Sequence, residues 1–276
     1  MTDPVKQMWD DNGAGSDDEW GALTVEPSGV SYRDAGPDLM WVEPDGAAQD
    51  KVIFVLHGGG FVSGSFASHR KLAGHLASAA GTRALLVHYR LAPEHVFPAQ
   101  LEDAVGAYRW LAEQGVAIGL AGDSCAGSLG IGMLLRAREL GLPLPAAIFL
   151  MSPWTDLEQT GTSFESNAGT DLFFTRAMVQ GLADLYLRDG ASPKDPLVNA
   201  LYADLTGFPP LYLQVGADES LLEDARMLAR HARSAGVEVL LDEFPGQLHT
   251  FQMAAGRTAV ADDAIGRFAQ WVSPRF

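Results

Sequence analysis

Six short apolar runs alternate with amphipathic stretches along the chain, and this alternation limits the folds that it can adopt. The apolar runs have the length of buried strands, whereas the stretches between them repeat apolar residues with a helical period. Such alternation predicts an α/β fold, with a mainly parallel sheet covered by helices on both faces. The expected strands are residues 52–57, 83–89, 117–122, 146–151, 211–215 and 237–243. The expected helices are residues 69–80, 99–114, 125–140, 220–235 and 258–272.

Two further parts of the chain complete this outline. Residues 30–32 and 39–42 fit added antiparallel strands. The connection between residues 152 and 211 is much longer than an ordinary loop and is too apolar for a plain surface segment. Its large apolar residues are Phe164, Phe173, Phe174, Met178, Leu182, Leu185 and Tyr186. A chain of 276 residues is long enough for one α/β domain with a large core.

The sequence Gly-Asp-Ser-Cys-Ala-Gly at residues 122–127 stands where an expected strand ends and an expected helix begins. A serine at such a sharp turn is exposed at the end of the sheet, beside the N–H groups that open the helix. Ser124 is therefore placed to act as a nucleophile. Glycine-rich turns are also common in α/β proteins that have no nucleophile, so the assignment depends on the rest of the chain.

The sequence His-Gly-Gly-Gly-Phe at residues 57–61 follows the first expected strand of the core. Consecutive glycines allow the backbone to approach a ligand and to direct N–H groups at an oxygen that becomes negative during acyl transfer. A phosphate-binding loop is the alternative, but no Lys-Ser/Thr pair follows at P-loop spacing and the pattern GxGxxG is absent here. The motif therefore favours an oxyanion hole.

A serine nucleophile needs a base, and the base needs a carboxylate that orients it. His249 follows an expected strand and a Pro-Gly turn, so it lies on a loop just past a strand end, whereas His231 falls inside an expected helix among arginines. Asp218 follows the expected strand 211–215 and is the favoured carboxylate, with a helix N-cap as its alternative role. The order Ser124, Asp218, His249 matches that of an α/β-hydrolase triad.

Three other carboxylates lie close to Asp218. Glu219, Glu223 and Asp224 are interpreted as charges in the opening turns of the following helix. Negative charge at a helix N-terminus suits the helix dipole.

Together these motifs resemble the hormone-sensitive-lipase-like family of α/β-hydrolase carboxylesterases, which carries HGGG-type oxyanion motifs. The motifs at residues 57–61 and 122–127 resemble its oxyanion loop and its nucleophile turn, and Tyr-Arg-Leu-Ala-Pro-Glu at residues 89–94 resembles a further signature. Other matching stretches lie at residues 97–99, 101–103, 152–156, 195–197, 216–219 and 221–224. The resemblance covers most of the chain.

The resemblance implies an α/β-hydrolase fold whose mainly parallel central sheet is flanked by helices and covered by a helical cap. It implies one domain over residues 1–276, with a cap from residues 1–45 and 155–208. The catalytic core would comprise residues 46–154 and 209–276.

The resemblance also implies a role for individual residues. Ser124 would be the nucleophile, His249 the general base and acid, and Asp218 the carboxylate that orients it. The oxyanion hole would use the N–H groups of Gly59, Gly60 and Cys125. The supporting residues would be His57, Gly58 and Asp123. Arg90 and Glu94 are interpreted as a buried or half-buried polar network beneath the oxyanion loop.

Two positions differ from the family pattern. Ala126 stands where the nucleophile turn usually carries glycine, which predicts slight crowding that Gly127 relieves. Cys125 replaces a smaller residue beside the nucleophile. Because only its N–H group is needed, its thiol is expected to be a passive core group.

Charge and composition limit the partners and the location. The net charge of −16 disfavours nucleic acid, anionic membranes and strongly anionic substrates, so a small neutral ester is the expected substrate. No run of 18 apolar residues and no signal-peptide pattern is present, which predicts a cytoplasmic protein that does not bind membranes. A single cysteine excludes an intrachain disulfide. No metal or organic cofactor is expected, because no cluster of ligands has the necessary spacing.

The predicted activity is that of a serine carboxylesterase, which hydrolyses neutral esters through an acyl-enzyme intermediate. A preference for short acyl chains follows from the resemblance alone. A lactonase or an acetyl-ester or amide deacetylase would need the same residues and stays open. A non-catalytic small-ligand receptor on the same fold is the alternative from another class, and the presence of His249 argues against it. A homodimer also stays open.

Overall fold

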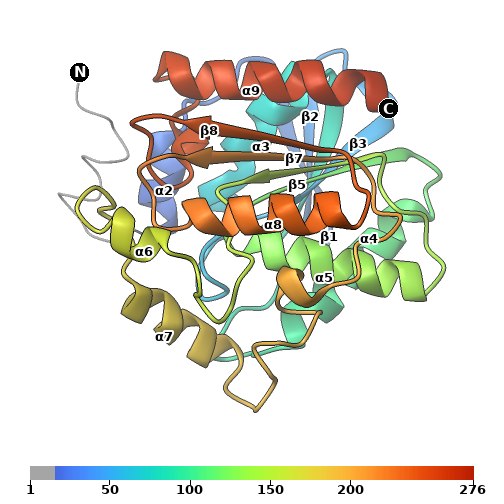
Figure 1. Cartoon of the computed structure of the whole chain (residues 1–276). Coiled ribbons are helices and arrows are strands. Elements are labelled where there is room, and N and C mark those ends of the chain that lie inside the picture. Colours follow the sequence, from blue (N-terminus) through green and yellow to red (C-terminus); the bar gives the residue numbers. More distant parts are fainter. Residues whose placement is uncertain (1–15) are drawn as a thin grey trace.

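The computed structural model describes residues 16–276, and its centre is an eight-stranded sheet (Figure 1). The strands are β1 (Val30–Gly36), β2 (Leu39–Pro44), β3 (Ala48–Leu56), β4 (Thr82–Val87), β5 (Ala117–Asp123), β6 (Ala147–Met151), β7 (Leu211–Gly216) and β8 (Val239–Phe244). Their order is β1-β2-β4-β3-β5-β6-β7-β8. β2 pairs antiparallel with β1 and β4, and all other neighbours are parallel. The expected α/β architecture and the two added antiparallel strands are confirmed.

Helices cover both faces of the sheet, as the alternating pattern predicts (Figure 1). α3 (Phe66–Ala80) and α9 (Ala259–Val272) pack on one face. α4 (Ala99–Ala112), α5 (Ala126–Glu139) and α8 (Leu222–Ser234) pack on the other. The middle strands read as continuous apolar runs because helices bury them from both sides, and every residue of β6 is buried.

The long connection between β6 and β7 forms α6 (Ser163–Ser166), α7 (Arg176–Tyr186) and a short 3-10 helix (Ala200–Tyr202), outside the sheet layers (Figure 1). The end of α7 is attached to the core, because the ring of Tyr186 stacks on Phe61 with centroids 3.7 Å apart. Its carbonyl oxygen also accepts a hydrogen bond of 3.0 Å from the N–H of Phe97.

The N-terminal part of the expected cap differs from the prediction. Residues 30–36 and 39–44 form β1 and β2 and therefore lie in the sheet. The short helix α2 (Asp17–Leu23) packs against α3. Residues 1–15 of the expected cap lie outside the described residues. Between residues 16 and 276, no helix combines the length and the apolar character that a membrane crossing requires.

A buried carboxylate links α8 to the chain that follows β6. Asp224 Oδ2 accepts hydrogen bonds from the N–H groups of Thr155 at 2.9 Å and Asp156 at 3.0 Å. Its Oδ1 is buried, with no hydrogen-bond partner among the described residues. Burial raises the pKa of Asp224 to about 8. Asp224 does lie in the first turn of α8, but its burial contradicts the interpretation as an ordinary helix-start charge.

This raised pKa has a consequence for stability. Because the folded protein retains a proton that the unfolded chain releases above about pH 4, the contribution of Asp224 to stability falls as the pH rises from about 4 to about 8. Asp224→Asn keeps an oxygen acceptor and has no charge to bury. Between pH 5 and pH 9, we expect the melting temperature of the wild type to fall further than that of this variant. The difference between the two falls should be about 2–4 °C for each kcal/mol of unfolding free energy that the Asp224 carboxyl loses over this pH range. Thermal unfolding at both pH values measures the difference, with the exposed Asp50→Asn as control. Parallel melting curves for wild type and Asp224→Asn would contradict this account.

Candidate active site

Ser124 occupies the turn between β5 and α5 in a left-handed backbone conformation, with φ at 54°. Such a conformation is costly for a residue with a side chain and persists only when neighbouring contacts hold it. Here the Ser124 N–H donates to the carbonyl of Met151 at 3.0 Å, and the Ser124 carbonyl accepts from Gly127 and Trp154 at 2.9 and 2.8 Å. The turn is thus held on both sides.

The departure at Ala126 is accommodated by its neighbour in the turn. A Cβ atom at Gly122 would lie only 2.8 Å from the Cβ atom of Ala126, so the absence of a side chain at residue 122 makes room for it. Gly127 is also required, because a Cβ there would lie 2.7 Å from Pro153. The crowding that the sequence predicts at Ala126 is therefore relieved at Gly122, whereas Gly127 makes room for Pro153.

The N–H groups of Gly59 and Gly60 in the glycine-rich loop after β3 have no oxygen acceptor among the described residues, and that of Gly60 hydrogen-bonds to the Cys125 thiol. Gly59 and Gly60 have φ angles of 113° and 61°, a region that glycine adopts without strain. Within residues 16–276, no oxygen atom accepts a hydrogen bond from the N–H groups of Gly59, Gly60 or Cys125. N–H groups without an oxygen acceptor at such a turn can bind an oxyanion.

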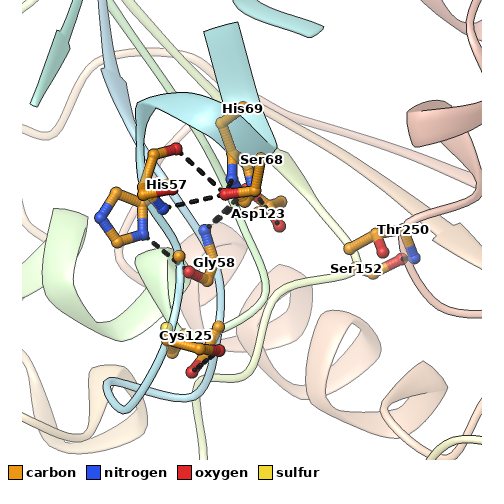
Figure 2. A network of polar contacts seen from close by, with 12 residues as sticks. His57, Gly58, Ser68, His69, Asp123, Cys125, Ser152 and Thr250 are labelled. Carbon is orange, nitrogen blue, oxygen red and sulfur yellow. Dashed lines mark hydrogen bonds and ion pairs between the residues drawn. The ribbon is translucent and has the colours of Figure 1, made fainter. Parts of the chain in front are cut away.

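A hydrogen bond to Asp123 connects this loop to the nucleophile turn (Figure 2). Its Oδ1 accepts a 2.9 Å hydrogen bond from Gly58 N–H and lies 3.2 Å from His69 Nε2, while His69 Nδ1 lies 2.7 Å from Ser68 Oγ. Burial by itself raises the pKa of Asp123, but the nearby His69 lowers it below the ordinary value. A Cβ at Gly58 would lie 2.2 Å from Asp123 Oδ2, so only glycine fits next to the Asp123 carboxylate.

His57 and Cys125 are core groups next to the loop. His57 stacks on Tyr89 with centroids 4.1 Å apart, and its Nδ1 donates to the Gly58 carbonyl at 2.7 Å. Burial, and then the charge on His69, lower the pKa of His57 to about 3, so the ring is neutral. Burial raises the pKa of Cys125 to about 12, and its Sγ lies 3.7 Å from Tyr89 Oη. A protonated, buried thiol has the character of the passive core group expected from the sequence.

His249 lies on the loop after β8, just before a 3-10 helix (Phe251–Ala254), and is buried. Its Nδ1 is 3.2 Å from Oε1 of Glu219, and its ring meets the ring of Phe174 at 90° with centroids 4.8 Å apart. His249 and Ser124 line the same pocket. His231 instead contacts the carbonyl of Ala203 at 2.7 Å, away from this pocket.

The prediction of Asp218 as the carboxylate beside His249 is wrong, because Glu219 holds that place. Glu219 is fully buried, and its Oε2 accepts hydrogen bonds from Gly216 N–H at 2.9 Å and from Ser152 Oγ at 2.7 Å. Asp218 is partly exposed, and within the described part of the chain its carboxylate does not contact His249.

The turn after β7 explains this difference. β7 ends at Gly216 and α8 begins only at Leu222, so Glu219 precedes the helix and folds back toward the strand end. The sequence shows two adjacent carboxylates but not which of them faces inward. Ser152 was also missed as part of this site, although it lies in a stretch that resembles the family pattern. Its Oγ accepts a hydrogen bond of 3.0 Å from Thr250 N–H (Figure 2). Because the same Oγ donates to Glu219, Ser152 joins Glu219 to the loop of His249.

The interpretation of Arg90 and Glu94 as buried support is also wrong. Arg90 is exposed and pairs with Asp103 at 2.9 Å, and Glu94 is exposed. Tyr89 contacts the loop instead, since its Oη donates to the carbonyl of His57 at 2.7 Å. Aromatic stacking and this hydrogen bond need a buried residue, which sequence position alone does not identify.

Ser124, His249 and the glycine-rich loop line a pocket of about 140 Å³. Its polar lining includes Asp17, Ser63, Ser68, His69, Asp123, Ser124 and His249. Its apolar lining includes Trp20, Trp154, Phe174, Met178, Val179 and Leu182. Of the predicted site residues, Gly59 and Gly60 also line the pocket. The apolar residues of the long connection therefore supply part of its wall.

Comparison with known proteins agrees with this architecture. A sequence profile described as the alpha/beta hydrolase fold matches residues 53–253. The chain is 42% identical to an acetyl-hydrolase of Streptomyces hygroscopicus, over 80% of this chain and 76% of that protein. It is 34% identical to an esterase of Acinetobacter venetianus, over 82% of this chain and 76% of that protein.

A solved structure extends the match to nearly the whole chain. The crystal structure of an esterase from the bacterial hormone-sensitive lipase family superposes with a TM-score of 0.92 at 39% identity. The superposition covers 98% of this chain and 96% of that one. The motifs, the fold and these matches agree with one another, and the chain belongs to the hormone-sensitive-lipase-like esterases of the α/β-hydrolase fold.

Proposed function

We propose that the protein is a serine carboxylesterase for small neutral esters, in which Ser124, His249 and Glu219 form the catalytic triad. One observation carries this proposal. Ser124 and His249 line a single pocket beside a loop whose glycine N–H groups have no oxygen acceptor among the described residues, and Glu219 contacts Nδ1 of the histidine. This arrangement supplies a nucleophile, a base, an orienting carboxylate and an oxyanion site together.

In the proposed mechanism, Ser124 Oγ attacks the ester carbonyl while His249 Nε2 takes the serine proton. Glu219 accepts a hydrogen bond from the Nδ1–H of His249, which leaves Nε2 unprotonated and able to act as the base, and the negative charge of Glu219 stabilises the imidazolium that forms. The protonated histidine then gives its proton to the departing alcohol, and the acyl group stays on the serine. Water repeats the two steps on the acyl-enzyme and releases the acid.

The negative oxygen of the tetrahedral intermediate would be bound by the N–H groups of Gly59, Gly60 and Cys125. Loss of one such donor typically costs about 2.7–4 kcal/mol of transition-state stabilisation. In this chain Asp123 supports the donors by its hydrogen bond to Gly58, because this contact sets the position of the loop relative to Ser124.

The size and the lining of the pocket support small substrates. Pockets for drug-sized ligands enclose about 300–1,000 Å³, whereas this one encloses about 140 Å³. Most of its lining is apolar, which suits an uncharged acyl chain. The similarity to an acetyl-hydrolase points in the same direction.

We therefore expect kcat/KM for p-nitrophenyl esters to be highest between acetate and butyrate and to fall at least about tenfold by laurate, because the longer chain exceeds the enclosed volume. Release of p-nitrophenolate across the series measures this. Equal or rising kcat/KM up to laurate would contradict a small acyl pocket.

An acetyl-ester or amide deacetylase is a second candidate, which the acetyl-hydrolase similarity favours over a lactonase. The same triad would act on an acetamide, but an amine leaves less readily than p-nitrophenolate. Comparing the hydrolysis of p-nitrophenyl acetate with that of p-nitroacetanilide separates ester hydrolysis from amide hydrolysis.

We further propose a cytoplasmic location, which the single, buried cysteine supports because it fits a reducing compartment. A homodimer remains an expectation that size-exclusion chromatography of the purified chain can test.

A further inference from the structure

Asp17 places a carboxylate in the wall of the proposed substrate pocket. It is the first residue of α2, and its Oδ1 accepts a 3.0 Å hydrogen bond from the N–H of Gly64, which also lines the pocket. This contact ties the carboxylate to the same loop that carries Gly59 and Gly60. Asp17 thus lies in the part of the pocket wall next to the glycine-rich loop.

Among residues 16–276, no ion pair to another side chain neutralises the charge of Asp17. The other lining carboxylate, Asp123, pairs with His69 at 3.2 Å. For Asp17, the described residues offer no lysine, arginine or histidine within ion-pair distance. A carboxylate beside apolar walls attracts a cation more strongly than it would in water, because field lines concentrate in such a site.

An aromatic ring lies on the same face of α2. Trp20 is three residues after Asp17, a spacing that brings two side chains of a helix together, and it too lines the pocket. The face of an indole ring attracts cations, and aromatic surfaces are the usual recognition element for quaternary ammonium groups. The helix therefore presents both a charge and a ring that suit an ammonium group.

We infer that, beyond the uncharged esters of the proposed function, this pocket accepts and prefers esters of the same size that carry an ammonium group, with Asp17 as the ion partner and Trp20 as the aromatic surface. The inference rests on the proposed esterase function and adds the charge class of its substrate. It makes Asp17 and Trp20 specificity-determining residues that take no part in the chemical step.

The test compares matched pairs of substrates that differ only in charge. Acetylcholine and 3,3-dimethylbutyl acetate carry the difference on the alcohol, and ethyl trimethylglycinate and ethyl 3,3-dimethylbutanoate carry it on the acyl group. The quantity measured is the ratio of kcat/KM for the cationic ester to that for the neutral ester, by pH-stat titration. Intrinsic reactivity cancels when this ratio is compared between variants.

We expect Asp17→Asn to lower the ratio in at least one pair by about 5- to 30-fold. Asparagine keeps an oxygen that can accept from Gly64 N–H, so the loop contact is retained. Asp18→Asn is the matched control, because Asp18 has the same charge, lies next in the helix, is exposed and does not line the pocket. Its ratio should stay within about twofold of the wild type. Asp17→Glu should keep the preference.

Four results would overturn the inference. They are an unchanged ratio in Asp17→Asn for both pairs, an equal fall in Asp18→Asn, an equal loss in Asp17→Glu, and stronger inhibition of the wild type by 3,3-dimethylbutanol than by choline. The last needs no variant and decides the matter even if Asp17→Asn does not fold. Failure of the wild type to hydrolyse either neutral ester would instead overturn the esterase proposal.

Discussion

Ser124→Ala is expected to lower kcat/KM for p-nitrophenyl acetate by about 10⁴- to 10⁶-fold, the largest loss in the set. Without the hydroxyl no acyl-enzyme can form, and only the oxyanion donors and substrate binding remain to accelerate attack by water. The turn itself should persist, because its hydrogen bonds to Met151, Gly127 and Trp154 are made by the backbone of residue 124.

The measurement is release of p-nitrophenolate at saturating and limiting substrate, with the melting temperature of the variant as a check of folding. Cys125→Ala is the informative control, since alanine retains the N–H group and removes only a buried thiol whose raised pKa, about 12, keeps it protonated. Its activity should fall by no more than about tenfold. Full turnover by Ser124→Ala, or an equal loss in Cys125→Ala, would contradict the assignment of the nucleophile.

Glu219→Gln is expected to lower kcat by about 10³- to 10⁴-fold, while Asp218→Asn should change it by no more than about threefold. The oxygen of a glutamine can still accept from Gly216 N–H, but its NH₂ group would then face His249. That contact favours the tautomer with the proton on Nε2, which cannot accept the serine proton. The negative charge that stabilises the imidazolium is lost as well.

These two substitutions make a matched pair, because each replaces a carboxylate by its amide at adjacent positions. Steady-state kinetics of both variants measure the difference in kcat. As the folding control, the melting temperature of each variant is compared with that of the wild type. A similar loss in both variants, or a larger loss in Asp218→Asn, would show that the buried contact between Glu219 and His249 is not the catalytic one.

Local sequence patterns determine much of this protein. The six core strands and the five long helices lie within a few residues of their predicted positions, because continuous apolar runs and helical periodicity reflect burial by immediate neighbours. The serine turn and the glycine loop are recognisable for a similar reason. Each depends on backbone conformations that its own residues allow, such as φ of 113° at Gly59.

The carboxylate of the proposed triad is the clearest case that sequence could not decide. Asp218 and Glu219 are adjacent, equally charged and equally well spaced from the end of β7. Which side chain turns inward depends on the path of the turn, and that path is set by contacts with Gly216, Ser152 and the loop of His249. Arg90 is a related case, since its motif does not reveal that the side chain is exposed and pairs with Asp103 of α4.

The sequence by itself thus determines the order of strands and helices along the chain and points to the proposed nucleophile, glycine loop and histidine, because each is recognised from residues close together in the chain. Only the tertiary structure decides that Glu219, and not Asp218, contacts His249. It also decides that Asp123 accepts a hydrogen bond from Gly58 of the glycine loop, and that Asp17 and Trp20 line the pocket. The physical reason is that these features arise from contacts between segments far apart in sequence, where small changes in backbone path select one side chain over its neighbour.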